Sequence, residues 1–371
     1  MSGAAAPAGT NPAGAVTTVL GPVAPADLGL VLPHEHLLCD LRALWHPPPQ
    51  TRPDLLALVD ADPTPTDRGP LASDPYVCRP NLLLDDPQRS VAELAHFRAA
   101  GGGALIELTS LGLGPRPAGL RRISAASGVH VVAGCGWYRE STDPPGLREA
   151  PEAALAESLL ATATAGFPGS GGVRPGIIGE IGTGDPIHAH EVKALRAAAA
   201  VQRATGLAIA VHLALWGRQG GRVLDILEAA GVDPRRVYLC HLGEQPAALD
   251  YQRSLLDRGA WIGFDTFGAE YALDSVAAPA GAAPPYPHPG PRLATDEERL
   301  GGVLRLLEAG YAGQLLLSQD VCERLQLRAY GGTGYAHLLT TVRPRLRRAG
   351  VDEPTLERLF RENPLRLLTG A

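Results

Sequence analysis

The sequence predicts an α/β fold, specifically a (β/α)8 TIM barrel with long loops after strands 1 and 7. The first observation behind this is a repeated alternation, in which an amphipathic stretch ends at glycine and a short apolar run follows. The second is the count, because eight such apolar runs match the eight parallel strands of a barrel. The third is that six of the runs end at or near a His, Asp or Glu, the side of a barrel where active sites form.

The expected strands and helices alternate along the chain. The strands are 28–36, a run ending near Thr109, a run ending near Gly136, then 176–180, 207–212, 236–241, 260–265 and 315–320. The helices that lead into or separate them are expected at 90–103, 120–128, 191–206, 220–235, 246–259 and 296–310. An alternation of this length favours one closed parallel barrel over two open sheets.

Two long segments interrupt the alternation, residues 46–80 after the first strand and roughly 266–295 after the seventh. Both are rich in proline and glycine, and in a barrel both fall on the face that carries the strand ends. We therefore expect a roof over the site. For residues 55–72, an unstructured insertion without a role is an equally good interpretation.

Composition bounds the class of protein. The chain has 371 residues, of which 45% are apolar and 19% charged, as in a globular protein with a sizeable core. The net charge of −6 and the absence of a cluster of basic residues with interleaved aromatics argue against a nucleic-acid or membrane partner. We expect a small-molecule substrate as the partner, and monomer and homodimer both stay open.

The first fifteen residues contain no basic residue and no apolar core of the signal-peptide type. We expect a flexible leader at 1–15, a single domain at 16–371 and a cytoplasmic protein. The five cysteines are odd in number and lack the CxxC spacing of a thiolate metal site, so reduced, mostly buried thiols are expected.

The segment "LPHEHLLCD" raises the question of a metal site. On a strand, His34 and His36 project to the same face, and Glu35 points away. An isolated His-x-His is a weak signal, and a lone histidine such as the one in "AVHLA" is more typical of a hydrogen-bonded core residue. Four histidines and two acids at five strand ends nevertheless supply the imidazole and carboxylate ligands of a hydrolytic metal centre.

Several longer motifs carry a family resemblance. They are "PHEHLLCD", "GIIGEIGTGD", "LCHLGE", "GFDTFG", "LLSQDV" and "YGGTGYAHLL". On these motifs the chain resembles the phosphotriesterase-related family, in the phosphotriesterase-like branch of the amidohydrolase superfamily. The resemblance covers nearly the whole chain apart from the leader.

The resemblance implies a binuclear centre of two divalent ions, with Zn²⁺ expected and Mn²⁺, Co²⁺ or Fe²⁺ as alternatives. The more buried ion would be held by one set of side chains, the more exposed ion by a second, and a bridging acid would join them. The implied residues are His34, His36 and Asp320 for the first ion, His212 and His241 for the second, and Glu180 as the bridge.

Well-known members of this family bridge the two ions with a carboxylated lysine. Lys193 is the only lysine of the chain and lies thirteen residues past Glu180, inside an expected helix. The resemblance therefore implies the glutamate-bridged subgroup.

The implied activity is hydrolysis of carboxylic esters or lactones by a bridging hydroxide, with weak phosphotriesterase activity as a side reaction. Asp320 and Glu180 are the catalytic candidates, and Asp320 is the expected proton shuttle to the leaving group. Alternatives are an amidase acting on N-acyl compounds, a mononuclear deaminase-like amidohydrolase and, last, a non-catalytic binding protein. A mononuclear enzyme has no use for a bridging Glu180.

Substrate contacts are expected from Trp137 and Tyr138, which follow the third strand. Family lactonases carry a tyrosine at what resembles the Tyr138 position, and a tyrosine that merely packs the barrel rim is the alternative.

Two acids are expected to support the ligands without binding metal, Glu244 and Asp265. Phosphotriesterases pair the first of these positions with a histidine after the seventh strand, where this chain has Thr266. The proton relay is therefore incomplete.

Three further histidines, His188, His190 and His337, are not expected to be ligands. The pattern "PIHAHE" is again His-x-His, but it falls in a loop that enters a helix.

Overall fold

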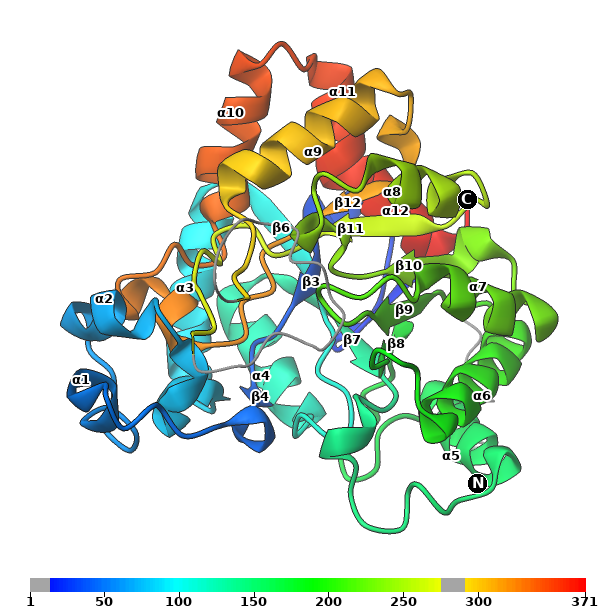
Figure 1. Cartoon of the computed structure of the whole chain (residues 1–371). Helices are drawn as coiled ribbons and strands as arrows, with labels where there is room; N and C mark the ends of the chain where they lie inside the picture. The colour runs from blue at the N-terminus through cyan, green and yellow to red at the C-terminus, as the bar shows by residue number, and fades with distance from the viewer. Residues whose placement is uncertain (1–13, 275–290) are drawn as a thin grey trace, which may run out of the picture.

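The computed structural model describes residues 14–274 and 291–371. Eight parallel strands form one sheet in the order β12-β11-β10-β9-β8-β7-β6-β3, which confirms the predicted barrel (Figure 1). The strands are β3 (Leu30–Glu35), β6 (Gly102–Glu107), β7 (His130–Cys135), β8 (Ile177–Gly182), β9 (Ile209–His212), β10 (Val237–Leu239), β11 (Trp261–Phe264) and β12 (Leu315–Leu317).

The barrel closes where the segment after β12 meets β3. The amide of Asp320 donates to the carbonyl oxygen of His34 at 3.2 Å, and the amide of His36 donates to the carbonyl oxygen of Val321 at 3.2 Å. These bonds bring the first and the last candidate ligands of the chain together.

Helices surround the strands in Figure 1. Those of the βα alternation are α3 (Pro87–Ala99), α4 (Pro117–Ser127), α5 (Glu152–Ala165), α6 (Ala189–Thr205), α7 (Gly220–Ala229), α8 (Leu249–Leu256) and α9 (Asp296–Glu308). Three more follow at the C-terminal end, namely α10 (Arg343–Arg348), α11 (Glu353–Glu357) and α12 (Asn363–Thr369).

The strands are apolar on both faces because both faces are covered. Along β6, Leu105 packs in the large cluster that extends under the helices, whereas Ala104 and Ile106 belong to a second cluster with residues of the other strands. Successive side chains thus point to opposite faces, and only the residues at the strand ends are free to carry chemistry.

The first long loop is folded. It contains α1 (Pro53–Leu56) and α2 (Arg68–Leu71), which lie beside the barrel in Figure 1. Leu55, Leu71 and Val77 form a small buried cluster that also includes Leu325 from the segment after β12. The interpretation of residues 55–72 as an unstructured insertion is therefore wrong.

The described part of the second long loop meets the first. The amide of Ala272 donates to the carbonyl oxygen of Ala72 at 2.9 Å, and the amide of Asp274 donates to that of Ser73 at 3.0 Å. Residues 275–290 of this predicted loop, and residues 1–13 of the predicted leader, lie outside the described residues. The two loops meet on one side of the barrel, as expected for a roof.

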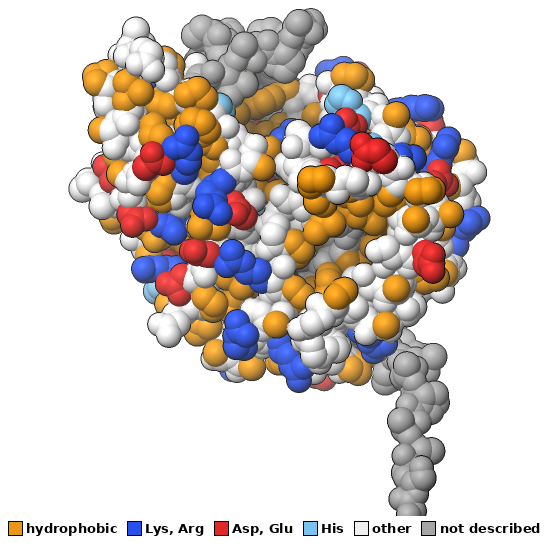
Figure 2. All heavy atoms as spheres, turned by 90° about the horizontal axis from the view of Figure 1, so that it is seen from below, with side chains coloured by type: hydrophobic (Ala, Val, Ile, Leu, Met, Phe, Trp, Pro, Cys, Tyr) orange, Lys and Arg blue, Asp and Glu red, His pale blue; other side chains and the backbone are white. Residues whose placement is uncertain are grey.

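Two short antiparallel pairs complete the described chain, β1 (Val16–Thr18) with β2 (Gly21–Val23) and β4 (Cys39–Asp40) with β5 (Leu83–Leu84). All five cysteines are buried and unbridged. Within 14–274 and 291–371, no helix has the length and apolarity that crossing a membrane requires. Figure 2 shows basic and acidic side chains interspersed on the face drawn there.

Candidate metal centre

Six polar side chains converge at the carboxyl ends of the strands. Two lie on β3 and β8 and one ends β9, while the other three follow β3, β10 and β12 within three residues. They are His34, Glu180 and His212, then His36, His241 and Asp320. All are buried except Asp320, whose side chain is 17% exposed.

One group surrounds Asp320. Its Oδ1 lies 3.2 Å from His36 Nε2 and 3.6 Å from His34 Nε2. His34 Nε2 in turn lies 3.7 Å from Glu180 Oε1. Three elements far apart in the sequence thus direct donor atoms at one point.

A second group surrounds the same oxygen of Glu180. Its Oε1 lies 3.1 Å from His212 Nδ1 and 3.3 Å from His241 Nε2, and these two nitrogens are 2.9 Å apart. Glu180 therefore lies between the two groups and contacts both.

These spacings fit divalent cations. Two ligand atoms of a tetrahedral zinc ion, each about 2.1 Å from the metal, lie about 3.4 Å from each other. The six distances above range from 2.9 to 3.7 Å. Within the described part of the chain, Nε2 of buried His34, the nitrogen that faces Glu180 and Asp320, has no hydrogen-bond partner, which fits a nitrogen available to an ion.

The electrostatics also favour cations. Burial alone would lower the pKa of His34, but the Glu180 and Asp320 carboxylates outweigh it and raise this pKa to about 9. Burial alone would raise the pKa of Glu180, yet His34 and His212 bring it well below its ordinary value. Burial lowers the pKa of His212 to about 4, so its ring is neutral and free to act as a ligand.

The backbone is unusual at two of these residues. His241 has a φ of 67° and Asp320 a φ of 49°, and they are the only non-glycine residues with positive φ among those the structure describes. For residues other than glycine this conformation costs free energy, and it is concentrated at functional sites. Asp320 lies in the turn after β12, not on the strand itself.

Asp265, which follows β11, contacts two of the histidines on the side away from Glu180. Its Oδ1 accepts from His241 Nδ1 at 3.0 Å, and its Oδ2 lies 3.3 Å from His34 Nδ1. The hydroxyl of Tyr238 donates to the same carboxylate at 2.5 Å. These contacts orient the opposite ring nitrogens toward Glu180 and Asp320.

Two further buried acids were not identified from the sequence. Glu107, at the end of β6, accepts from the Thr109 hydroxyl, which lies 2.8 Å from His36 Nδ1. Glu35, between the two histidines, accepts from Ser318 Oγ at 2.8 Å and from the amide of Val321 at 2.9 Å, and so holds the turn that carries Asp320. The sequence feature that could have identified them is an acid at the end of an otherwise apolar strand.

The two predicted substrate residues point in different directions. The hydroxyl of Tyr138 lies 3.3 Å from His212 Nδ1, and its side chain lines a cavity beside the centre. Trp137 is buried in the hydrophobic core and does not line this cavity. Of the two, only Tyr138 lines the cavity.

Glu244 lies in a separate network. Its Oε1 accepts from Arg299 at 2.8 Å and from the Thr266 hydroxyl, and its Oε2 accepts from the amide of Ala294 at 2.8 Å. Arg299 is completely buried, so this carboxylate neutralises a buried cation. Thr266 connects the network to the cavity wall.

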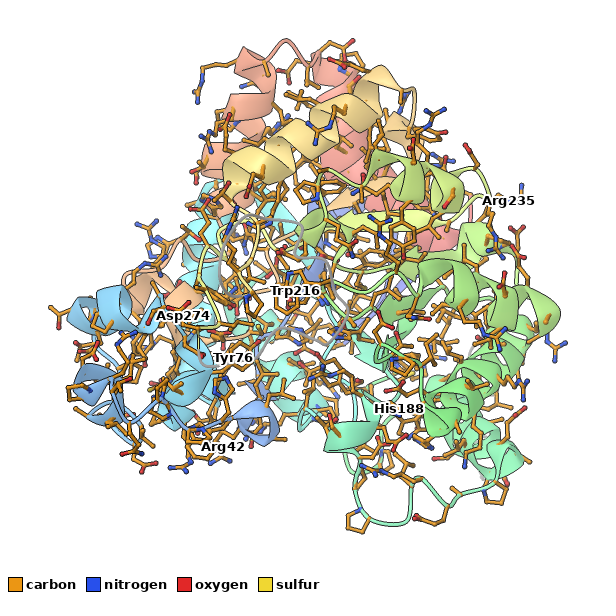
Figure 3. The ribbon with its side chains drawn as sticks, in the orientation of Figure 1. Arg42, Tyr76, His188, Trp216, Arg235 and Asp274 are labelled. Atoms are coloured by element: carbon orange, nitrogen blue, oxygen red, sulfur yellow. The ribbon has the colours of Figure 1, made fainter. Side chains whose placement is uncertain are left out.

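The cavity has a volume of about 980 Å³ and opens at the strand ends. Apolar side chains line it from the segment after β4 (Leu41 and Leu44), from the two long loops (Tyr76 and Leu273) and from the loop after β9 (Trp216). Figure 3 places Trp216 over the middle of the barrel and Tyr76 beside it, toward α1 and α2. The described loops therefore form walls of the site.

Three histidines predicted not to be ligands lie elsewhere. His190 is buried with its Nε2 2.9 Å from Asp143 Oδ2, and His337 Nε2 lies 2.5 Å from Asp296 Oδ2. His188 precedes α6, and its side chain is 54% exposed.

Comparison with known proteins gives one family. The model of the phosphotriesterase family matches residues 14–368. An N-acetyltaurine hydrolase of Tetraodon nigroviridis is 31% identical over 364 residues, which cover 97% of this chain and 99% of that protein.

Solved structures share the fold along the whole described barrel. The crystal structure of a resiniferatoxin-binding protein from Rhodobacter sphaeroides superposes with a TM-score of 0.89 at 38% identity, covering 96% of this chain and 95% of that one. A mutant PTE-like lactonase from Deinococcus radiodurans gives a TM-score of 0.70 at 28% identity, covering 95% and 99%. This chain belongs to the phosphotriesterase family, within the amidohydrolase superfamily.

Proposed function

We propose that the protein is a metal-dependent hydrolase that cleaves a carboxylic acyl bond with two divalent cations. The single observation that supports this best is the position of Glu180, whose Oε1 lies within 3.7 Å of His34, His212 and His241. A mononuclear centre would not need a carboxylate between two groups of ligands. His34, His36 and Asp320 would hold one cation, His212 and His241 the other, and Glu180 both.

Two divalent cations bound there would supply a nucleophilic water at neutral pH and would polarise the carbonyl oxygen of the substrate. Asp320 is the residue best placed to move a proton. Five of the six line the cavity, and Asp320 is the most exposed of them, with 17% of its side chain accessible. Burial alone would raise the pKa of Asp320, but His34 and His36 outweigh it and lower this pKa. Asp320 can accept a proton from the nucleophile and deliver it to the leaving group.

Tyr138 would orient the substrate. Its hydroxyl lies beside His212, and burial raises its pKa well above the ordinary value, so it stays a hydrogen-bond donor at neutral pH. A neutral phenol at this position can donate to the carbonyl oxygen of the substrate.

For the substrate class we favour carboxylic esters or lactones, supported by the Tyr138 position and by the similarity to the PTE-like lactonase. Amide hydrolysis is the second candidate, favoured by the N-acetyltaurine hydrolase that matches 97% of this chain. Histidine and carboxylate donors suit Zn²⁺, with Mn²⁺, Co²⁺ and Fe²⁺ as alternatives.

The test is an activity screen on full-length protein of known metal content. Protein carrying two equivalents of zinc, manganese or cobalt is assayed with γ- and δ-lactones, phenyl acetate, N-acetyl amino compounds and a dialkyl aryl phosphate. Turnover of the first two groups above the third supports the ester assignment, and the opposite order supports an amidase. Protein with two bound ions and no activity on any acyl compound would contradict the proposed function.

A further inference from the structure

Arg139 lies directly after Tyr138 and lines the same cavity. We propose that Arg139 binds an anionic group of the substrate, so that the compound cleaved at the metal centre carries a carboxylate or sulfonate in addition to its acyl bond. This inference rests on the proposed function and specifies its substrate class.

Arg139 lacks a protein anion of its own. Throughout 14–274 and 291–371 no carboxylate forms an ion pair with it, and its buried Nε has no hydrogen-bond partner. The acids nearby are already engaged. Glu140 pairs with Arg148 at 3.3 Å, and Glu191 accepts from the amides of Gly184 and His188 at 2.9 and 2.8 Å.

The position of Arg139 matches that of a substrate-binding group. Its Cζ lies 5.5 Å from the centre of the Tyr138 ring, and the Tyr138 hydroxyl reaches His212. An anion bound to this guanidinium would therefore lie beside Tyr138, the residue that we expect to contact the carbonyl of the bond to be cleaved.

The surroundings would strengthen such a contact. Leu41, Leu44, Leu113 and Trp216 line the cavity with Arg139, so that part of its wall is apolar. In a partly dehydrated pocket a charge-assisted hydrogen bond between guanidinium and carboxylate or sulfonate is stronger than in bulk water, and arginine can make it with two parallel N–H donors.

The other basic side chains of the cavity are less suited. Arg218 is exposed at the rim, with its Cζ 5.7 Å from the Tyr251 ring centre. His46 Nε2 lies 3.5 Å from Asp74, a buried acid. The acid Asp185 also lines the cavity, but it accepts from Gln219 Nε2 at 2.5 Å. Among the described residues that line the cavity, Arg139 is thus the arginine beside Tyr138, and no carboxylate pairs with it.

The test uses matched pairs of compounds that differ only in charge. One pair has an amide bond, 4-acetamidobutanoate and the neutral 4-acetamidobutanamide. The other has an ester bond, monophenyl glutarate and its neutral carboxamide, phenyl 5-amino-5-oxopentanoate. The kcat/KM values of the metal-loaded full chain are compared with those of Arg139→Gln and Arg139→Lys. Arg235→Gln is the matched control, because Arg235 lies on the outer surface, paired with Asp233 (Figure 3).

We expect Arg139→Gln to lower the ratio of kcat/KM for the anionic compound to kcat/KM for the neutral one by about 10- to 100-fold, which is the usual contribution of a hydrogen bond to a charged group. The change should come mainly from a higher KM for the anionic compound. Arg139→Lys should restore part of the ratio, and Arg235→Gln should leave it unchanged. Equal losses on both members of a pair would overturn the proposal and make Arg139 a support for Tyr138.

A binding measurement separates this proposal from the proposed function. Calorimetric titration of 4-acetamidobutanoate needs no turnover, so it reports on the subsite even if neither bond is cleaved. Tighter binding of the anion than of its neutral amide, lost in Arg139→Gln, supports the subsite. Equal affinity of the wild-type protein for both compounds overturns it.

Discussion

The chain contains two His-x-His motifs, and the structure gives them opposite surroundings. His34 and His36 lie at the end of β3, and both direct Nε2 at Asp320. His188 and His190 lie at the start of α6, where one side chain is mostly exposed and the other is buried against Asp143. The same residue pattern therefore gives convergence on a strand end and divergence at a helix start, because alternate residues share a face only on a strand.

The two regions also differ in charge state. At the metal centre burial is outweighed by neighbouring charges, so the pKa of Glu180 falls and that of His34 rises to about 9. In the second region burial dominates, which raises the pKa of Asp143 to about 7 and lowers that of His190. The first region keeps its carboxylates ionised, which suits the binding of cations, whereas the second favours a neutral pair.

The largest expected effect is seen when one acid is removed from each region, Glu180 from the strand ends and Glu191 from the start of α6. Glu180→Ala should lower kcat/KM by about 10³-fold or more, because both cations lose a ligand and with it several kcal/mol of transition-state stabilisation. Glu191→Ala should keep activity and metal content and should lose only about 1 kcal/mol of stability, since Glu191 forms the capping box of α6. Steady-state kinetics and thermal unfolding of both variants measure this contrast. Equal activity losses would mean that Glu180 has no special role.

The next effect concerns Asp320, which is assigned both a ligand and a proton-transfer role. Asp320→Asn keeps an oxygen that can coordinate but removes the proton acceptor, so alkyl esters and amides should react about 10²-fold more slowly. Phenyl esters with good leaving groups should lose less. If both substrate types slow equally while metal content is unchanged, Asp320 acts as a ligand alone.

A smaller effect is expected behind the ligands. Asp265→Asn removes the carboxylate that orients His241 and contacts His34, and metal affinity should fall about 10-fold or more. Competition with a chelator measures the affinity. A matched change in the second region, Asp143→Asn, should leave it unaltered, and a comparable loss there would show that the effect is not specific to the centre.

The smallest effect is on the pH dependence of stability. Burial raises the pKa of Asp143 above its ordinary value of 3.8 to about 7 in the folded chain. Its contribution to stability is thus fully present below pH 3.8 and is lost as pH rises to about 7. Across this window the free energy of unfolding of the wild-type protein should fall by on the order of 1 kcal/mol relative to that of Asp143→Asn. Melting temperatures of both proteins, measured over the same pH range, report this difference. A relative rise with pH would show an ionised pair with His190.

Short-range periodicity predicted the barrel and placed polar residues at its strand ends, whereas the set of six ligands was implied by the family resemblance. Apolar runs specify strands, and the carboxyl ends of parallel strands meet on one face of a barrel. What the sequence could not show depends on pairing between distant segments. Glu35 holds the turn at Ser318–Val321, and Arg139 has no carboxylate partner among the described residues, while the neighbouring Glu140 pairs with Arg148.

Trp137 illustrates a second limit. Adjacent residues after a strand face opposite sides, and the sequence alone does not fix which of Trp137 and Tyr138 turns inward. Hydrogen bonds between Leu111 and both Gly136 and Tyr138 determine this in the structure. The exact end of β12 was also unpredictable, and Asp320 lies in a turn stabilised by Glu35 through the Val321 amide.

The most direct test of a binuclear centre at the strand ends is the metal content of two double variants. It is measured by elemental analysis after metal loading and gel filtration. The unaltered chain and His188→Ala/His190→Ala should each hold two equivalents of divalent metal per chain. His34→Ala/His36→Ala should hold one equivalent or less and should lose hydrolytic activity. Two tightly bound equivalents in His34→Ala/His36→Ala, or fewer than two in the unaltered chain, would contradict a binuclear centre at the strand ends.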